Sequence, residues 1–545
     1  MHPVTAKLAA DMSIDEQIGQ LFVVGFHGTT PSPDIVDLIK NHHVGNIILF
    51  SRNVQDTAQV RALTYELQRI AHEAGHRYPL LITVDQENGM VQRLGKGSTA
   101  FPGNMALGAT GSIQLVQDVA YACGQELKAL GINMNLAPVV DINNNPANPV
   151  IGNRSFGEVP QDVARMGVAA LEGYARAGVI SCLKHFPGHG DTAVDSHLSL
   201  PVIAHSLERL EQVELVPFKA GIAAGADSIM TAHVYFPTLI EEEGIPATLS
   251  STIIRGLLRQ RLGYQGVVIS DCLEMNAISK TFGFTRGSVM ALQAGIDLVL
   301  ISHVYEHQLE GLNAIREAVA KGVISEEIIQ EALERVLELK ARRLSWEDTL
   351  ARQTNTIVNS PEHQELSTQA YERSTTVIKD EAGLLPLRLQ PEQRVLLVYP
   401  QKDIWTKATD QYHQFEVLAH AIRERHPQVT AHAYKPVENE ATPTELLQAA
   451  NEADLIIAVT VNANIDRAQA QVLKDLQRTG RPLIGIAGYN PYDLLAFPEL
   501  TTYLVTYEYT APALTAAARV LFGEISAQGH LPVSLPGLYE HGHHL

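Results

Sequence analysis

Cysteine is scarce in this chain of 545 residues, which has only Cys123, Cys182 and Cys272. They are odd in number and far apart, so they suggest neither a disulfide framework nor a zinc cage. The sequence also lacks an apolar run long enough to span a membrane, and residues 1–10 contain no apolar segment typical of a signal peptide. These absences predict a protein of a reducing, cytoplasmic compartment.

Positive charge is also in short supply. Lysine and arginine total 41 against 60 aspartates and glutamates, which gives a formal net charge of −19. Nucleic acids and anionic membranes attract basic patches, so neither is expected as a partner. No glycine-rich phosphate-binding motif stands between a strand and a helix, so nucleotide binding has no support.

Short apolar runs recur through the first part of the chain, with helix-period stretches between them. Continuous apolar strands indicate burial on both faces and hence a parallel sheet. Eight such strands with intervening helices predict a (β/α)8 TIM-type barrel, with a doubly wound open sheet as the alternative. The runs are Leu21 to Gly25, Gly45 to Phe50, Pro79 to Val84, Ile132 to Val140, Val179 to Leu183, Ala226 to Ala232, Gly266 to Ser270 and Ile296 to Ile301.

A second α/β unit is expected after the barrel. A helix from Ser325 to about Arg343 closes the first unit, residues 346–361 are polar and aperiodic, and the strand–helix rhythm then restarts. The predicted domains are a barrel at 1–345, a linker at 346–370 and a C-terminal α/β sandwich at 371–545. The strands expected in the sandwich are Arg394 to Tyr399, Asp454 to Val461, Pro482 to Ile486 and Thr502 to Thr506.

Ionisable residues follow most of the strands of the predicted barrel. Barrel enzymes place their chemistry at the carboxyl ends of the strands. A ring of acids, histidines and arginines there suits a polar substrate such as a sugar. The ring is formed by Arg52, Asp85, Asp141, Lys184, His185, His233, Asp271 and His303. No comparable cluster occurs in the second unit, which is expected to support or partly close the site.

The densest group of acid–base residues lies in the loop Lys184 to His197. Its side chains could bind a metal through His185, His189, Asp191 and His197, but their spacing fits no standard signature and Lys184 would repel a cation. Alternatively, one histidine transfers protons and is oriented by an aspartate. Two pairs offer this, Asp195 with His197 and His189 with Asp191, and Asp271 is available as a carboxylate nucleophile.

Four ordered motifs resemble glycoside hydrolase family 3, in its β-N-acetylglucosaminidase branch. The resemblance is strong over residues 13 to about 340, and the tail resembles the second α/β domain of the family. The motifs are Asp85-Gln86-Glu87, Asn148-Pro149-Val150-Ile151-Gly152-Asn153-Arg154-Ser155-Phe156, Lys184-His185-Phe186-Pro187-Gly188-His189-Gly190 with Asp195-Ser196-His197, and Ser270-Asp271.

The resemblance implies roles for particular residues. Asp271 would be the nucleophile that forms a covalent glycosyl-enzyme, and His197, paired with Asp195, the general acid/base. This choice favours the later of the two His/Asp pairs and leaves His189 and Asp191 to shape the loop. Sugar-binding positions of the family match Asp85, Arg93, Arg154, Lys184 and His185.

The sequence departs from the family pattern at two places. The usual Asp-Gln-Glu-Gly-Gly-Arg reads Asp85-Gln86-Glu87-Asn88-Gly89-Met90, which is expected to alter local packing or aglycone contacts. Cys272 follows the expected nucleophile where a second aspartate is common. It could modestly shift the pKa of Asp271, or it could be a small buried residue.

The resemblance implies a retaining exo-β-N-acetylglucosaminidase that needs no metal or organic cofactor. Its substrates would be terminal N-acetylglucosaminides of muropeptides or chitin-type oligosaccharides. Phosphorolysis at the same site is an alternative, because a histidine repels phosphate less than a carboxylate would. A catalytically silent sugar-binding protein and a metal-dependent hydrolase are further alternatives.

Overall fold

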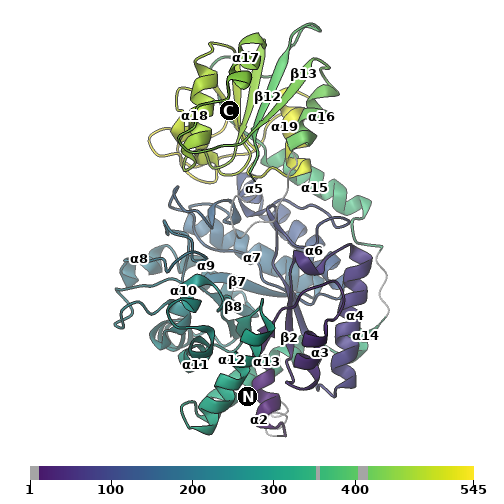
Figure 1. Ribbon diagram of the computed structural model, residues 1–545, viewed down its shortest axis with the longest axis vertical. Coiled ribbons are helices and arrows are strands. Elements are labelled where there is room, and N and C mark those ends of the chain that lie inside the picture. The colour runs from purple at the N-terminus through teal and green to yellow at the C-terminus, as the bar shows by residue number, and fades with distance from the viewer. Residues whose placement is uncertain (1–10, 352–355, 403–414) are drawn as a thin grey trace.

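The computed structural model describes residues 11–351, 356–402 and 415–545, which form two units (Figure 1). A barrel occupies the N-terminal part, and a separate sheet flanked by helices forms the C-terminal part. No helix in these ranges is long and apolar enough to cross a membrane.

The barrel is closed, as the sequence predicts, and the alternative of an open sheet is wrong. Its eight strands are in the order β10-β1-β2-β3-β6-β7-β8-β9, and all pairings between them are parallel. A parallel bridge between Ile269 and Leu298 joins the two ends of this sheet into a ring. The strands are β1 Phe22–Val24, β2 Asn46–Leu49, β3 Leu81–Val84, β6 Met134–Asn135, β7 Ile180–Phe186, β8 Ser228–Thr231, β9 Val267–Ile269 and β10 Val299–Ile301.

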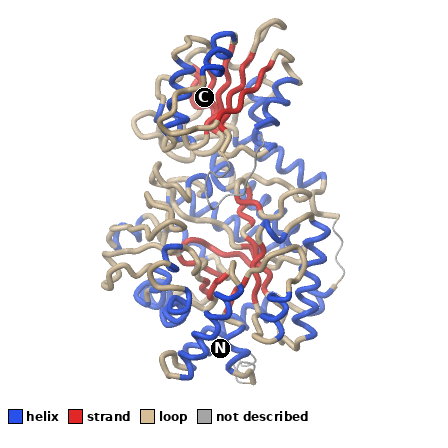
Figure 2. Tube along the Cα trace, viewed as in Figure 1, coloured by secondary structure: helices blue, strands red, loops and turns tan. Residues whose placement is uncertain are grey.

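All residues of these strands are buried, which explains why most of their residues are apolar. Helices surround them (Figure 2), and Ser13 begins the first through the capping box that the sequence predicts. These helices are α2 Ile14–Gly19, α3 Pro33–Lys40, α4 Thr57–Glu73, α5 Asn104–Ala109, α6 Ile113–Ala129, α7 Pro160–Ala177, α8 Leu207–Gln212, α9 Val216–Ala223, a π-helical stretch Thr252–Arg261, α10 Asn276–Ser279, α11 Phe284–Ala294, α12 Tyr305–Ala320 and α13 Glu326–Arg343.

The second unit is a six-stranded sheet in the order β11-β16-β15-β14-β12-β13. The four strands expected from the sequence are β12 Val395–Pro400, β14 Leu455–Thr460, β15 Leu483–Ala487 and β16 Thr502–Val505. Two edge strands were not predicted: β11 Thr376–Asp380, antiparallel to β16, and β13 Val429–Tyr434. Five of the six residues of β13 are at least partly exposed, so its sequence shows no apolar run. The helices are α16 Phe415–Arg423, α17 Thr444–Glu452, α18 Arg467–Gln477 and α19 Ala511–Leu521.

The segment between the two units is partly helical. It contains α14 Trp346–Leu350 and α15 Pro361–Ser374, while residues 352–355 of the expected linker lie outside the described residues. α15 packs against α5 and α6 of the barrel and against α19 of the second unit. On α15, Nδ1 of His363 lies 2.9 Å from Oε1 of the buried Glu126 on α6. This helix therefore joins the barrel to the sheet domain.

Apolar side chains of the barrel extend into the second unit. Met90 lies in the turn between the short strands β4 Gln86–Asn88 and β5 Val91–Gln92, and it belongs to a buried cluster that includes Tyr489 and Tyr509. Met105 of α5 belongs to the other apolar cluster of the sheet domain. The departure of Met90 from the family pattern thus contributes to packing between the domains.

A buried carboxyl group also links the units. Oε1 of Glu508 accepts the backbone N–H of Gly103 of the barrel at 2.9 Å, and Oε2 accepts the hydroxyl of Tyr371 on α15 at 2.9 Å. Burial raises the pKa of Glu508 from 4.5 to about 7, although these hydrogen bonds oppose the shift. The group is therefore protonated in the folded protein at mildly acidic pH, where it would ionise in the unfolded chain.

The substitution Glu508→Gln should flatten the dependence of stability on pH. Because the folded pKa of Glu508 is raised, its contribution is fully present below pH 4.5 and is lost as the pH rises to about 7. The wild-type free energy of unfolding should fall by about 3 kcal/mol relative to the variant over this interval. Urea denaturation at a series of pH values measures this. Exposed Glu438→Gln is the matched control, and parallel curves for Glu508→Gln and wild type would contradict the prediction.

Candidate active site

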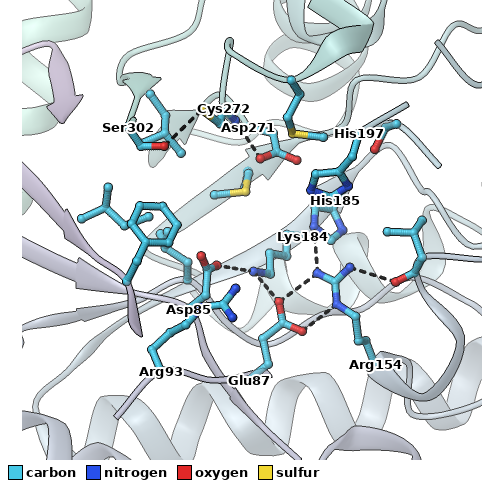
Figure 3. Close-up of a pocket in the computed structure, with 18 of the residues that line it drawn as sticks. Asp85, Glu87, Arg93, Arg154, Lys184, His185, His197, Asp271, Cys272 and Ser302 are labelled. Carbon is cyan, nitrogen blue, oxygen red and sulfur yellow. Dashed lines mark hydrogen bonds and ion pairs between the residues drawn. The ribbon is translucent and has the colours of Figure 1, made fainter. Parts of the chain in front are cut away.

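A cavity of about 530 Å³ opens at the carboxyl ends of the barrel strands. Seven of the eight residues that the sequence predicts for catalysis and sugar binding line it (Figure 3), and the eighth, Asp195, contacts His197. The lining includes Asp85, Arg93, Arg154, Lys184, His185, His197 and Asp271, together with Phe50, Arg52, Glu87, Cys272 and His303. The strand ends thus bring together residues that are far apart in the sequence, such as Arg52 and His303, which are separated by 251 positions.

A buried network of ion pairs occupies one side of the cavity. Nζ of Lys184, at the end of β7, lies 2.7 Å from Oδ1 of Asp85 and 2.7 Å from Oε1 of Glu87. Nε and Nη2 of Arg154 each donate to a different oxygen of Glu87 at 2.8 Å. Two cations and two carboxylates therefore balance in charge, and Figure 3 shows them in one continuous network.

The network holds its members in their charged forms. Burial alone would raise the pKa of Glu87, but Arg154 and Lys184 hold it far below its ordinary value. Burial alone would likewise lower the pKa of Lys184, but Asp85 and Glu87 hold it above its ordinary value. Glu87 belongs to a motif noted in the sequence, yet its part in this network was not predicted.

His185 is oriented by Asp141, a second group whose role was not predicted. Nδ1 of His185 lies 2.7 Å from Oδ2 of the fully buried Asp141. The other ring nitrogen of His185, Nε2, lies 3.4 Å from Nη2 of Arg154. These partners assign the proton to Nδ1, since the guanidinium can only donate to Nε2. Asp141 also accepts the backbone N–H of His189 at 2.7 Å, so one carboxylate fixes both the ring and the loop that follows it.

The loop of acid–base residues contains one histidine–aspartate pair. Nδ1 of His197 lies 2.7 Å from Oδ1 of Asp195, which also accepts the backbone N–H of His197 at 2.8 Å. His189 instead uses its two ring nitrogens on the hydroxyls of Thr192 and Ser196, each at 3.0 Å. The side chain of His197 is 29% exposed, so its Nε2 edge is accessible from the cavity.

The residues considered as metal ligands in this loop have separate partners. Asp191 binds Nε2 of His205 at 2.7 Å, while His185, His189 and His197 are engaged as described above. Each of these side chains is directed to a different neighbour, so the four do not form one ligand set.

Asp271 follows β9 on the wall shared with His197. Its Oδ1 accepts the backbone N–H of Cys272 at 2.7 Å. Burial alone would raise the pKa of Asp271, but electrostatic interactions with His233, His185 and His197 and the hydrogen bond from this N–H hold it below its ordinary value. Asp271 is therefore a carboxylate at neutral pH, as a nucleophile requires.

Cys272 bonds to Asp271 through its backbone N–H, and His233 contacts the carbonyl of Cys272. Burial raises the pKa of Cys272 to about 12, with Glu274 adding to the shift, so the thiol is neutral. His233 is fully buried between Thr248 and the carbonyl of Cys272, at 2.8 and 3.0 Å. His233 is therefore a buried, hydrogen-bonded residue, whereas His303 lines the cavity.

Glu274 fixes the rim of the cavity, and nothing in the sequence singled it out. Its two oxygens accept the backbone N–H groups of Ser302, His303 and Val304 at 2.7–3.1 Å, and Oε1 lies 2.8 Å from Nδ1 of His307. Glu274 lies near Cys272 and His303 in the one grouping of possible metal ligands within the described residues. Its oxygens are committed to the backbone of the loop after β10.

Arg52 completes the same rim. Its guanidinium carbon lies 4.3 Å from the centre of the Phe50 ring. Nη2 of Arg52 donates to the carbonyl of Ser302 at 2.6 Å, and Nη1 lies 3.1 Å from Nδ1 of His303. Its place after the second strand was noted in the sequence, but its contact with His303 depends on closure of the barrel.

Comparisons with known proteins agree with this architecture. Residues 13–339 match the model of the glycosyl hydrolase family 3 N terminal domain, and residues 375–542 match that of its C-terminal domain. Beta-hexosaminidase A of Pseudoalteromonas piscicida is 33% identical over 93% of this chain and 92% of its own length. Beta-N-acetylglucosaminidase/beta-glucosidase of Cellulomonas fimi is 29% identical over 96% of this chain and 94% of its own.

Solved structures resemble the whole chain. The glycoside hydrolase family 3 beta-N-acetylglucosaminidase from Paenibacillus sp. str. FPU-7 is 43% identical, with a TM-score of 0.88 over 96% of this chain and 99% of that one. A fungal multi-domain beta-N-acetylglucosaminidase is 44% identical with a TM-score of 0.92, and this chain spans 62% of its length. Because family models cover nearly all of both domains, the chain belongs to glycosyl hydrolase family 3.

Proposed function

We propose that this chain is a retaining exo-β-N-acetylglucosaminidase with Asp271 as nucleophile and His197 as general acid/base. The observation that carries the proposal is one cavity lined by an ionised carboxylate, an Asp195-oriented histidine and a charged polar network. Beta-N-acetylglucosaminidases among its similar proteins support the choice of sugar.

In the first step, Oδ2 of Asp271 attacks the anomeric carbon of N-acetylglucosamine. The glycosidic C–O bond breaks, its electron pair goes to the leaving oxygen, and Nε2 of the protonated His197 gives that oxygen its proton. Asp195 holds Nδ1 and stabilises the imidazolium that precedes this transfer. The product is a covalent ester between Asp271 and the sugar.

In the second step, water replaces Asp271. The now neutral Nε2 of His197 takes a proton from water, the water oxygen bonds to the anomeric carbon, and the bond to Asp271 breaks. Two displacements retain the anomeric configuration. Retaining glycosidases commonly use two carboxylates about 5 Å apart, whereas here an imidazole takes the second role.

The charged network binds the sugar. Asp85 accepts paired hydroxyl hydrogen bonds, while Lys184, Arg154 and Arg93 donate to hydroxyls or to the acetamido carbonyl. His185, with its proton on Nδ1, presents Nε2 to the same region. We propose terminal N-acetylglucosaminides of muropeptides or chitin-type oligosaccharides as substrates.

A cytoplasmic location is part of this proposal. The three cysteines are free and buried, as they would be in a reducing compartment. In the cytoplasm, the enzyme would encounter muropeptide fragments that the cell has taken up.

Asp271→Ala should lower kcat on 4-nitrophenyl N-acetylglucosaminide by at least about 10³-fold, because no covalent intermediate can form. Steady-state kinetics measure the loss. Cys272→Ala is the matched control, since it keeps the backbone N–H that holds Asp271 and should retain most activity. Wild-type turnover by Asp271→Ala would show that the chain uses a different nucleophile.

The acceptor in the second step is tested by the product. With chitobiose as substrate, we expect free N-acetylglucosamine at the same rate with and without inorganic phosphate. Mass spectrometry and a phosphate titration measure this. Accumulation of N-acetylglucosamine 1-phosphate would show that phosphate, rather than water, intercepts the glycosyl-enzyme.

A further inference from the structure

The loop of residues 141–156 lies between the acid–base loop and the second domain. On the acid–base side, the buried Asn148 joins the two loops. Its Nδ2 donates to the carbonyls of His189 and Gly190 at 3.0 and 2.8 Å and lies 3.3 Å from the hydroxyl of Thr192. These targets lie on the segment that leads to Asp195 and His197.

The two loops are also in direct backbone contact. A Cβ atom placed on Gly190 would lie 1.8 Å from the carbonyl oxygen of Ile142, so no side chain fits between them. A displacement of residues 141–148 therefore moves the acid–base loop directly, without an intervening flexible side chain.

On the other side, the second domain holds the 141–156 loop at separate points. Nδ2 of Asn143 donates to the hydroxyl of Tyr492 at 2.9 Å, and this hydroxyl lies 3.3 Å from the carbonyl of Asn143. Nδ2 of Asn464 donates to the carbonyl of Pro146 at 2.9 Å. Asn153, beside Arg154, donates to the carbonyl of Tyr507 at 2.8 Å.

The residues that make these contacts follow the strands of the second domain. Asn464 lies in the turn after β14, where the backbone N–H groups of Ile465 and Asp466 bond to the carbonyl of Asn462. Tyr492 is 1% exposed and lies in the helical turn Pro491–Ala496 after β15. Asn464 and Tyr492 are therefore both positioned by turns that directly follow strands of the sheet.

We propose that the second domain positions the acid–base loop through the 141–156 loop, with Tyr492 and Asn464 as positioning residues. This inference rests on the proposed function, because it assumes that His197 delivers the proton. Neither residue lines the cavity, so each acts through Asn143, Pro146 and Asn148. Loss of these contacts should misplace His197, while the ion pairs with Glu87 keep Lys184 and Arg154 of the sugar-binding network in place.

Leaving-group dependence separates this role from simple stabilisation of the fold. Departure of an N-acetylglucosamine from chitobiose needs a proton, whereas 2,4-dinitrophenolate leaves without one. The ratio of kcat/KM for the two substrates is independent of how much of the protein is folded. A misplaced His197 lowers this ratio, and a smaller folded fraction does not change it.

The test uses the full chain with Tyr492→Phe, Asn464→Ala and the double variant. For the double variant we expect kcat/KM on chitobiose to fall about tenfold or more, and on the dinitrophenyl glycoside less than about twofold. Inhibition by N-acetylglucosamine, which reports on the binding network, should be unchanged. Tyr399→Phe is the matched control, because its hydroxyl donates to Glu416 within the second domain.

His197→Ala shows the effect of losing the acid–base group completely. Its ratio of kcat/KM on chitobiose to kcat/KM on the dinitrophenyl glycoside should fall further than the ratio of the double variant. If His197→Ala lowers kcat/KM equally for chitobiose and for the dinitrophenyl glycoside, the acid–base assignment is wrong. The positioning role would then be wrong as well. If His197→Ala lowers the ratio but the double variant matches Tyr399→Phe, the proposed function stands and the positioning role is overturned.

Discussion

The site depends on the balanced burial of Lys184, Glu87, Arg154 and Asp85. Each of these charges alone would be strongly destabilising in the interior, and together they neutralise one another through bonds of 2.7–2.8 Å. The balance also fixes positions, because Glu87 is held by one cation from strand β7 and one from the loop of residues 141–156. Removing one partner would leave a buried charge uncompensated, so the network constrains three chain segments at once.

Around this network, single carboxylates hold the loops by accepting backbone N–H groups. Asp141 holds the chain at His185 and His189, Glu274 holds residues 302–304, and Asp195 holds the backbone of His197. The carboxyl group of Glu508, whose pKa is raised by burial, likewise accepts the N–H of Gly103 between the domains. A backbone N–H has a fixed direction, so each of these carboxylates fixes a loop as well as a side chain.

The sequence predicts more of the barrel than of its rim. Most buried strands are rich in apolar residues, so each of the eight predicted runs contains a barrel strand or overlaps one, although the fourth run, Ile132 to Val140, extends well past β6. The half-exposed β13 has no such signal. Motifs identified Asp271, His197 and the residues expected to bind sugar, and these residues line one cavity. Glu274, Asn148 and Asp141 act through backbone atoms of distant or adjacent loops, and residue identity alone carries little information about such contacts.

The proposed division of roles between Asp271 as nucleophile and His197 as acid/base agrees with their surroundings. Asp271 is partly buried at a strand end and stays ionised because nearby histidines and an N–H offset the cost of burial. His197 is partly exposed on a loop that Asp195 and the Asn148 contacts help to orient. A nucleophile must meet one carbon atom, and a rigid strand end suits it. An acid/base group must reach first a leaving oxygen and then a water molecule. A loop that is held by the 141–156 loop on one side and faces the cavity on the other suits that task better.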